Sequence, residues 1–179
     1  SFGQTCEHLR FLLNDSITKQ LVSDVPLCTF LSGGLDSSII TKFASDYCEK
    51  QGLPPLDTYS IDYVDNDKNF VKSDFQPNSD GFYIDLMNTN LHTNHHKIVI
   101  DTPELADALE DAMIARDMPG MADIDSSLLL FCKNVKKQMT VALTGECADE
   151  IFGGYPWFFR EDALKSNTFP WSISLTERQ

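Results

Sequence analysis

Residues 27–38 read LCTFLSGGLDSS, an apolar run followed by two glycines and a segment rich in hydroxyl groups. The apolar run Leu27–Leu31 is the pattern of a short strand buried on both faces. The segment Ser37–Glu49 has the pattern of a helix. The stretch therefore predicts a strand, a tight turn at the glycine pair, and a helix that begins directly after it.

A turn of this composition has the chemistry of an anion site. Its glycines let successive backbone N–H groups point inward, the dipole of the following helix adds positive potential, and Ser32, Ser37 and Ser38 supply hydroxyl donors. The lysine of the pattern G-x-x-x-x-G-K-S/T is missing, so backbone dipoles and a metal must offset the charge of a nucleotide. Asp36 is the obvious metal ligand. The alternative is a plain strand-to-helix turn with Asp36 as the helix N-cap.

A second glycine-bearing motif, Thr144–Tyr155, reads TGECADEIFGGY and follows an apolar run at Thr140–Leu143. The carboxylates of Glu146, Asp149 and Glu150 are crowded between its glycines. Like charges so close together repel unless a cation or ligand neutralises them, so the motif predicts Mg²⁺ bound together with phosphate. The alternative is an acidic, solvated loop capped by the glycine pair.

Strands and helices alternate along the rest of the chain. Further strands are predicted at Thr58–Tyr63, Lys97–Ile100 and Thr140–Leu143, and helices at Glu7–Val22, from Asp101 to about Ala115, and at Ser126–Lys137. The alternation predicts an α/β fold, a doubly wound parallel sheet with helices on both faces, in a single domain over residues 1–179. The polar stretch Asp62–Gly81 is predicted to be a long, mobile surface loop. Both glycine motifs follow strands, at the edge of the sheet where ligands bind.

The composition excludes several classes of protein. The chain has 179 residues with 14 Lys and Arg against 27 Asp and Glu, and its formal net charge of -13 would repel a nucleic-acid backbone. The 5 cysteines form no C-x-x-C pair, which argues against a disulfide framework or a zinc site. No secretory signal and no long apolar run is present. We expect a soluble, cytoplasmic protein with no nucleic-acid or membrane partner.

Both motifs resemble those of known families. SGGLDSS at residues 32–38 resembles the PP-loop signature of ATP pyrophosphatases, which have an adenine nucleotide alpha hydrolase-like fold. TGECADEIFGGY resembles the signature of the asparagine synthetase family, S-G-E-G-A/S-D-E-I/V/L-F-G-G-Y. Thr144 stands where the family usually has serine, and Cys147 where it usually has glycine; neither departure removes a carboxylate. Since SDVP at residues 23–26 also resembles the family, the similarity covers roughly residues 21–160.

The family resemblance implies a role for individual residues. Asp36 and Asp149 would hold Mg²⁺, and their carboxylates should approach within roughly 8 Å so that pyrophosphate bridges them through the metal. Glu146 would act near the acyl-adenylate as the base for incoming ammonia, and Ile61 matches the adenine-contacting position. The three acidic residues are the predicted catalytic groups. Residues that would bind pyrophosphate or AMP are Leu31, Ser32, Gly33, Gly34, Asp36, Ser37, Ser38, Thr144 and Gly145.

The resemblance also implies a reaction and its partners. A carboxylate, that of aspartate, would take AMP from ATP in the presence of Mg²⁺, and ammonia would then displace the AMP. The alternatives are a β-lactam- or peptide-forming amide ligase with another acceptor, and a nucleotide-binding fragment without turnover. The family's glutaminase domain is absent from this sequence, so we expect a synthetase domain alone, shortened at its C-terminal side. Such a chain would not hydrolyse glutamine and would receive ammonia from solution or from a glutaminase domain or subunit.

Three further features have simpler interpretations. His92, His95 and His96 are predicted to lie in a loop before the strand Lys97–Ile100 and not in a metal site. Cys147 is predicted to be a packing residue, because no histidine lies near it in the sequence to activate a nucleophilic thiol. The segment Arg116–Asp125 keeps two interpretations, a lining of the acyl-acceptor pocket and a plain turn.

Overall fold

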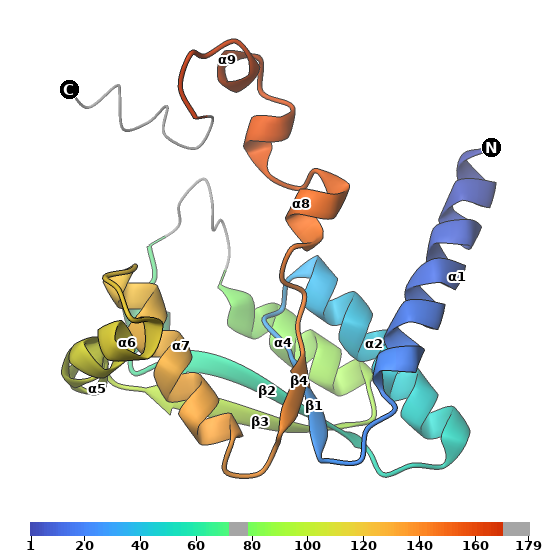
Figure 1. Ribbon diagram of the computed structural model, residues 1–179. Coiled ribbons are helices and arrows are strands. Elements are labelled where there is room, and N and C mark those ends of the chain that lie inside the picture. Colours follow the sequence, from blue (N-terminus) through green and yellow to red (C-terminus); the bar gives the residue numbers. More distant parts are fainter. Residues whose placement is uncertain (72–78, 170–179) are drawn as a thin grey trace. The chain divides into compact units, whose positions relative to one another are not determined.

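The computed structural model describes residues 1–71 and 79–169, in two compact units that divide after Thr144. Within these residues the first unit holds a parallel sheet with the strand order β3-β2-β1-β4 (Figure 1). The strands are β1 (Leu27–Phe30), β2 (Leu56–Tyr63), β3 (Thr93–Ile100) and β4 (Val141–Leu143). The chain winds outward from β1 to β3 and then crosses back to β4, which places a topological switch point between β1 and β4. The predicted doubly wound parallel sheet is confirmed.

In the first unit one helix precedes β1 and the others lie between the strands in sequence. They are α1 (Phe2–Gln20), α2 (Leu35–Gln51), α3 (Asn66–Asn69), α4 (Asp80–Asn90), α5 (Thr102–Asp107), α6 (Leu109–Arg116) and α7 (Ala122–Val135). The second unit has α8 (Ala148–Phe152), the 3-10 turn η1 (Pro156–Phe158) and α9 (Glu161–Leu164). None of the described helices is both long enough and apolar enough to cross a bilayer.

The predicted helix after Asp101 and the predicted loop Asp62–Gly81 differ from the structure. The helix expected to run from Asp101 to about Ala115 starts as predicted, with a capping box between Asp101 and Glu104, but it divides into α5 and α6 at Ala108. There the backbone N–H donates to carbonyl groups of both Glu104 and Ala106, which tightens the turn. The expected loop Asp62–Gly81 contains α3 and the start of α4, and its residues 72–78 lie outside the described part of the chain.

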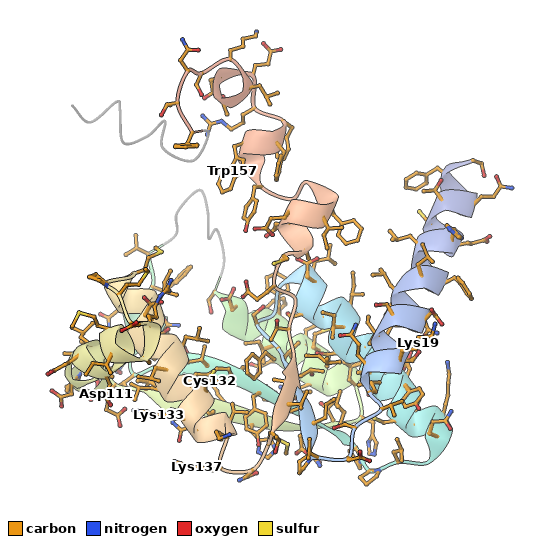
Figure 2. The ribbon with its side chains drawn as sticks, viewed as in Figure 1. Lys19, Asp111, Cys132, Lys133, Lys137 and Trp157 are labelled. Carbon is orange, nitrogen blue, oxygen red and sulfur yellow. The ribbon has the colours of Figure 1, made fainter. Side chains whose placement is uncertain are left out.

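One face of the sheet, which we call the α7 face, is covered by α7 and is mainly apolar. Cys28, Tyr59, Phe131 and Val135 are buried there together. The Phe131 ring meets that of Phe30 edge-on, with centroids 4.7 Å apart. Figure 2 shows α6 beside α7, where the Asp111 carboxylate and the Lys133 ammonium group are 2.9 Å apart. Burial raises the pKa of the Cys28 thiol to about 12, with a smaller effect of the nearby Asp57, so this thiol stays protonated.

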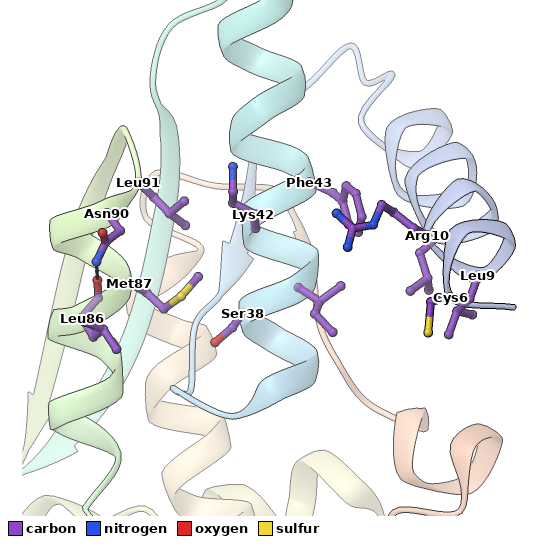
Figure 3. A pocket seen from close by; sticks show the side chains of 12 residues that line it. Cys6, Leu9, Arg10, Ser38, Lys42, Phe43, Leu86, Met87, Asn90 and Leu91 are labelled. Carbon is purple, nitrogen blue, oxygen red and sulfur yellow. Dashed lines mark hydrogen bonds between the residues drawn. The ribbon is translucent and has the colours of Figure 1, made fainter. Parts of the chain in front are cut away.

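The opposite face, the α2 face, mixes apolar and polar packing. Ile17, Ala44 and Leu56 form its apolar part. Beside them the hydroxyl groups of Thr29 and Thr41, both fully buried, lie 3.0 Å apart. Outside this layer α1, α2 and α4 enclose a groove of about 760 Å³ with a mostly apolar lining (Figure 3).

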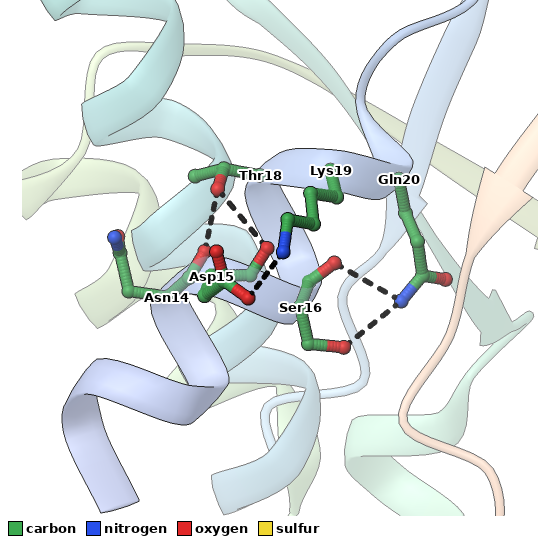
Figure 4. Close-up of polar contacts among 6 residues, drawn as sticks. All are labelled: Asn14, Asp15, Ser16, Thr18, Lys19 and Gln20. Atoms are coloured by element: carbon green, nitrogen blue, oxygen red, sulfur yellow. Dashed lines mark hydrogen bonds and ion pairs between the residues drawn. The ribbon is translucent and has the colours of Figure 1, made fainter. Parts of the chain in front are cut away.

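Helix α1 packs through its C-terminal half. Ile17 is buried, and polar groups of this half bond along the helix, with Lys19 Nζ 2.7 Å from the Asp15 carboxylate (Figure 4). The N-terminal half begins at Phe2, ahead of the predicted start at Glu7, because a capping box forms between Ser1 and Gln4. A local cap thus extends the helix beyond its apolar pattern.

Strand β3 begins earlier than predicted and includes two histidines expected in a loop. It starts at Thr93, so the loop prediction is wrong for His95 and His96. The imidazole of His96 lies 2.7 Å from the Asp57 carboxylate on the neighbouring strand and is stacked on the Tyr59 ring. Side-chain contacts with β2 therefore hold the polar first half of β3 in the sheet.

Replacing Phe131 by alanine should lower the free energy of unfolding by about 3–5 kcal/mol, because the ring fills the apolar core under α7. Urea denaturation followed by circular dichroism measures this loss. Phe11→Ala is the matched control: its ring is 65% exposed, so the change should stay within about 0.5 kcal/mol. Equal losses in the two variants would contradict the assignment of the core.

Candidate functional site

The loop of residues 31–38, called here the Gly-Gly loop, leaves the sheet at the carboxyl end of β1. Leu31 is buried, and its N–H donates to the carbonyl oxygen of Tyr59 at 2.8 Å. Gly33 then adopts φ +83°, a backbone conformation that favours glycine. The predicted strand, turn and helix are confirmed, and the loop lies at the edge of the sheet where ligands bind in this class of fold.

Serine hydroxyl groups close the Gly-Gly loop on itself. The Ser37 hydroxyl accepts from the Ser32 N–H at 3.2 Å, lies 3.0 Å from the Ser32 hydroxyl and donates to the Gly34 carbonyl oxygen at 3.1 Å. Ser37 is buried, so these bonds replace water in the loop. An anion that enters the loop can exchange them for its own oxygen atoms.

Helix α2 presents an N-terminus without a side-chain cap. Its N-cap is Gly34, in an extended conformation, and the described residues make no side-chain cap hydrogen bond there. The alternative interpretation of Asp36 as the N-cap is therefore wrong: Asp36 lies in the first turn and is partly exposed. The N–H groups and the dipole of a 17-residue helix remain directed at the mouth of the loop.

Gly33 also allows α4 to approach the loop. A Cβ atom at this position would lie 2.8 Å from the carbonyl oxygen of Asp80 and 3.2 Å from the Cβ of Tyr83. The side of the loop that faces α4 is thus occupied by atoms of that helix, so a ligand would have to approach from the side away from α4.

Strand β2 continues beyond the end of β1. The last residue pair between the two strands is Phe30 with Tyr59, whereas β2 continues to Tyr63 in contact with β3. Since Tyr59 accepts from Leu31, its main-chain groups point towards β1. Main-chain groups alternate in direction along a strand, so the N–H and C=O of Ile61 point to the same side, past the end of β1. A donor and an acceptor are thereby placed side by side on this edge.

In the second unit, backbone geometry explains the glycine pair of the second motif. Gly153 ends α8 with φ +69°, and Gly154 follows beside the Asp149 side chain, where a Cβ atom would lie 1.9 Å from Oδ1. The Tyr155 hydroxyl donates to Glu150 Oε1 at 3.0 Å, and this bond raises the pKa of Tyr155. Gly154 thus leaves room for the Asp149 carboxylate, and Tyr155 holds that of Glu150.

Cys147 has a conformation that explains why the family signature has glycine at this position. Its φ of +67° lies in the left-handed region, which is unfavourable for residues with a Cβ atom. The side chain is exposed, so the prediction of a packing role is wrong. The motif therefore keeps its turn despite the departure from glycine.

The predicted site residues fall in both units. Thr144 directly follows β4, whose Leu143 pairs with Thr29 of β1, so Thr144 and the Gly-Gly loop start at the same edge of the sheet. Gly145, Glu146 and Asp149 belong to the second unit, and the convergence of Asp149 with Asp36 stays a prediction. No group of three His, Cys, Asp or Glu side chains with metal-binding geometry occurs among the described residues.

A polar cavity beside the predicted site was missed. It has a volume of about 360 Å³ and lies between the end of β2, the middle of β3 and α4, with Asp62, His95 and Lys97 in its lining. Burial acts to raise the pKa of Asp62, but bonds from Lys97 at 2.6 Å and from Asn66 and the Tyr63 N–H outweigh it and hold the pKa below its usual value. Side chains alternate between the two faces of a strand, so the sequence could have indicated that His95 and Lys97 share a face. Placing them beside Asp62 also required the register between β2 and β3.

The segment Arg116–Asp125 has a structural explanation. The Arg116 guanidinium group pairs with the Asp125 carboxylate at 2.6 Å, and only 10% of the Asp125 side chain is exposed. Gly120 lies against this pair, where a Cβ atom would be 2.0 Å from Asp125 Oδ2. The contacts support the turn interpretation, while a substrate-facing role stays untested.

Comparisons with known proteins identify a family and several relatives of this chain. Residues 8–179 match the protein-family model described as asparagine synthase. The chain is 57% identical over 178 residues, 99% of its length, to asparagine synthetase (glutamine-hydrolyzing) 3 of Bacillus subtilis (strain 168), of which it covers 29%. It is 29% identical over 169 residues, 88% of its length, to asparagine synthetase B (glutamine-hydrolyzing) of Escherichia coli (strain K12), of which it covers 28%. The chain thus spans less than a third of the length of these curated relatives.

Gly33→Ala should destabilise the fold by more than about 2 kcal/mol, because the new methyl group meets the backbone of α4 and the residue has a positive φ. Thermal unfolding measures the loss. Gly52→Ala is the matched control, since Gly52 has φ +64° but nothing lies within 4 Å of its added Cβ atom. We expect a loss of about 1 kcal/mol there. Equal losses would contradict the close approach of α4 to the loop.

Proposed function

The chain belongs to the asparagine synthase family, and from this premise we propose that it binds ATP and transfers AMP to the side-chain carboxylate of aspartate. Ammonia then converts the acyl-adenylate to asparagine. The observation that carries the proposal is the Gly-Gly loop at the uncapped N-terminus of α2, next to the edge of β2 that β1 leaves open. The Gly-Gly loop suits phosphate, and the edge of β2 suits the adenine base.

The phosphate part supports cleavage between the α and β phosphates. We propose that the N–H groups of the loop and of the first turn of α2 hold the departing pyrophosphate, with Ser32, Ser37 and Ser38 as hydroxyl donors. These donors are already fixed in direction, so they stabilise charge that develops on the leaving group. The Ser32 and Ser37 hydroxyl groups already lie 3.0 Å apart, which supports the proposal that both can bind one phosphate oxygen.

The nucleoside part supports recognition of adenine. The Watson–Crick edge of adenine offers one acceptor and one amino donor side by side, which complements the N–H and C=O of Ile61. Leu31, Thr144 and Gly145, at or after the ends of β1 and β4, would bind the rest of AMP through main-chain groups.

Two carboxylates support a role for Mg²⁺ in the proposed reaction. Asp36 provides a carboxylate beside the loop, and Asp149 provides a second one that Gly154 allows to pack against the backbone. When bound, Mg²⁺ would offset the charge of the phosphates, which no lysine of the loop does. Glu146, in the turn before α8, would accept a proton from ammonia as it attacks the acyl carbon.

The reaction balances without a covalent enzyme intermediate. A carboxylate oxygen of aspartate attacks the α-phosphorus, the bond to the β-phosphate oxygen breaks, and pyrophosphate leaves. Ammonia then forms a C–N bond, the acyl C–O bond breaks, AMP leaves, and Glu146 takes up the proton. Holding the aspartate carboxylate in line with the departing pyrophosphate would accelerate the first step.

The setting of the chain is part of the proposal. Its curated relatives are named glutamine-hydrolyzing, so a glutaminase domain or subunit is the proposed source of ammonia. All the cysteines are free, and Cys28 and Cys48 are at least partly buried, which supports the reducing cytoplasm as the compartment.

ATP–pyrophosphate exchange tests the first half-reaction. Aspartate should stimulate the exchange, and Asp36→Asn or Asp149→Asn should lower it by roughly 10²–10³, because each variant removes a charged oxygen ligand at the phosphates. Asp111→Asn, on the exposed surface of α6, is the control that should leave the exchange unchanged. Stimulation by another carboxylate but not by aspartate would indicate a different amide ligase. ATP binding without any exchange would indicate a nucleotide-binding module.

Glu146→Gln separates the two half-reactions. The glutamine side chain cannot accept the proton of the attacking ammonia, so amide formation should fall by roughly 10²-fold or more while acyl-AMP formation is retained. Single-turnover assays that quantify acyl-AMP and asparagine measure the two steps. An equal loss in both steps would make Glu146 a nucleotide or metal residue instead.

A further inference from the structure

One imidazole connects two hydroxyl groups of β2. His95, on β3, has Nδ1 at 2.8 Å from the Thr58 hydroxyl and Nε2 at 3.0 Å from the Ser60 hydroxyl. Both hydroxyl groups are on buried residues, Thr58 with 0% and Ser60 with 2% of its surface exposed. Neither of these bonds belongs to the Gly-Gly loop or to the motif after β4.

The two hydroxyl groups lie on either side of the point where β1 ends. Thr58 is in the paired part of β2, opposite Thr29 of β1. Ser60 lies beyond the last pair, Phe30 with Tyr59, where β3 is the remaining neighbour. The imidazole thus links Ser60, the first residue of β2 beyond its pairing with β1, to Thr58, where β2 is paired with both β1 and β3.

The chemistry of the ring suits this position. Burial, together with the charges of His96 and Lys97, lowers the pKa of His95 and outweighs the opposite effect of Asp85. The neutral ring has one donor and one acceptor nitrogen, and a hydroxyl group can complement either. Loss of the ring would leave two buried hydroxyl groups without these partners, which is unfavourable unless the strand shifts to expose them.

The next residue after Ser60 is Ile61, whose main-chain N–H and C=O point past the end of β1. A shift of Ser60 changes the direction of the Ile61 N–H, because this group lies in the peptide plane that joins the two residues. Hydrogen bonds weaken steeply when their angle departs from linear, so a small rotation matters for a ligand held there.

We propose that His95 is a positioning residue for the nucleotide: by holding Ser60 it fixes the main-chain edge of Ile61 that receives the adenine base. The inference rests on the proposed binding of ATP. It adds a residue from the edge strand that would touch neither the base nor the phosphates.

The test compares two ligands that use different parts of the site. Titration calorimetry of the chain with AMP and, separately, with magnesium pyrophosphate gives one dissociation constant for each part. His95→Ala should raise the dissociation constant for AMP about tenfold, the equivalent of one lost or misaligned hydrogen bond, and leave that for pyrophosphate within about twofold. A general loss of structure would weaken both.

Two further variants make the comparison sharp. Ser60→Ala removes one hydroxyl group, is the smaller change to the fold, and should reproduce the selective loss of AMP affinity. His96→Ala is the matched control: the adjacent histidine bonds to Asp57, near the start of β2, and its loss should change neither constant.

Equal weakening of both ligands in His95→Ala and Ser60→Ala, or no change in either, would overturn the inference. So would wild-type chain that binds pyrophosphate but not AMP. Wild-type chain that binds neither ligand would contradict the proposed function itself, and the inference with it. A selective loss of AMP affinity in both variants, with His96→Ala unaffected, is the supporting result.

Discussion

The central strand of the sheet ends at Phe30, while its neighbour β2 continues to Tyr63, and the candidate site depends on this difference in length. Where β1 stops, the chain turns through the Gly-Gly loop into α2, so the N–H groups of a helix end are directed at the space above the sheet. On the other side of that space, β2 has main-chain groups that no longer have a strand beside them. A longer β1 would pair with that edge and leave no room for a ligand.

The two faces of the sheet make different contributions to that arrangement. Beneath α7 the packing is apolar, with Cys28 and Phe131 in one cluster, and it supplies much of the burial that stabilises the unit. On the α2 face, hydroxyl groups and an imidazole are paired in specific directions at Thr29, Thr58 and His95. Apolar packing tolerates small displacements, whereas a buried hydrogen bond requires one geometry. The α2 face, with its buried bonds, is the one that carries the Gly-Gly loop.

Local patterns were sufficient to predict β1, the turn and α2, because an apolar run followed by a glycine pair has few other solutions. They failed for β3, since His95 and His96 join the sheet through bonds to residues on β2 that are distant in sequence. The edge at Ile61 could be assigned from the family resemblance, but its physical basis required knowing where β1 ends. The packing role of Cys147 was wrong for a related reason, because its exposure depends on the turn around it and not on the residue type.

The approach of α4 to Gly33 restricts how the Gly-Gly loop can move. The carbonyl oxygen of Asp80 is 2.8 Å from the position that a Cβ atom of Gly33 would take, so the loop has no room to move towards α4. If the loop widens to admit a triphosphate, it must therefore move away from α4. A hinge that opens in a single sense has fewer conformations to sample before a ligand arrives, and less entropy is lost when the loop closes around it.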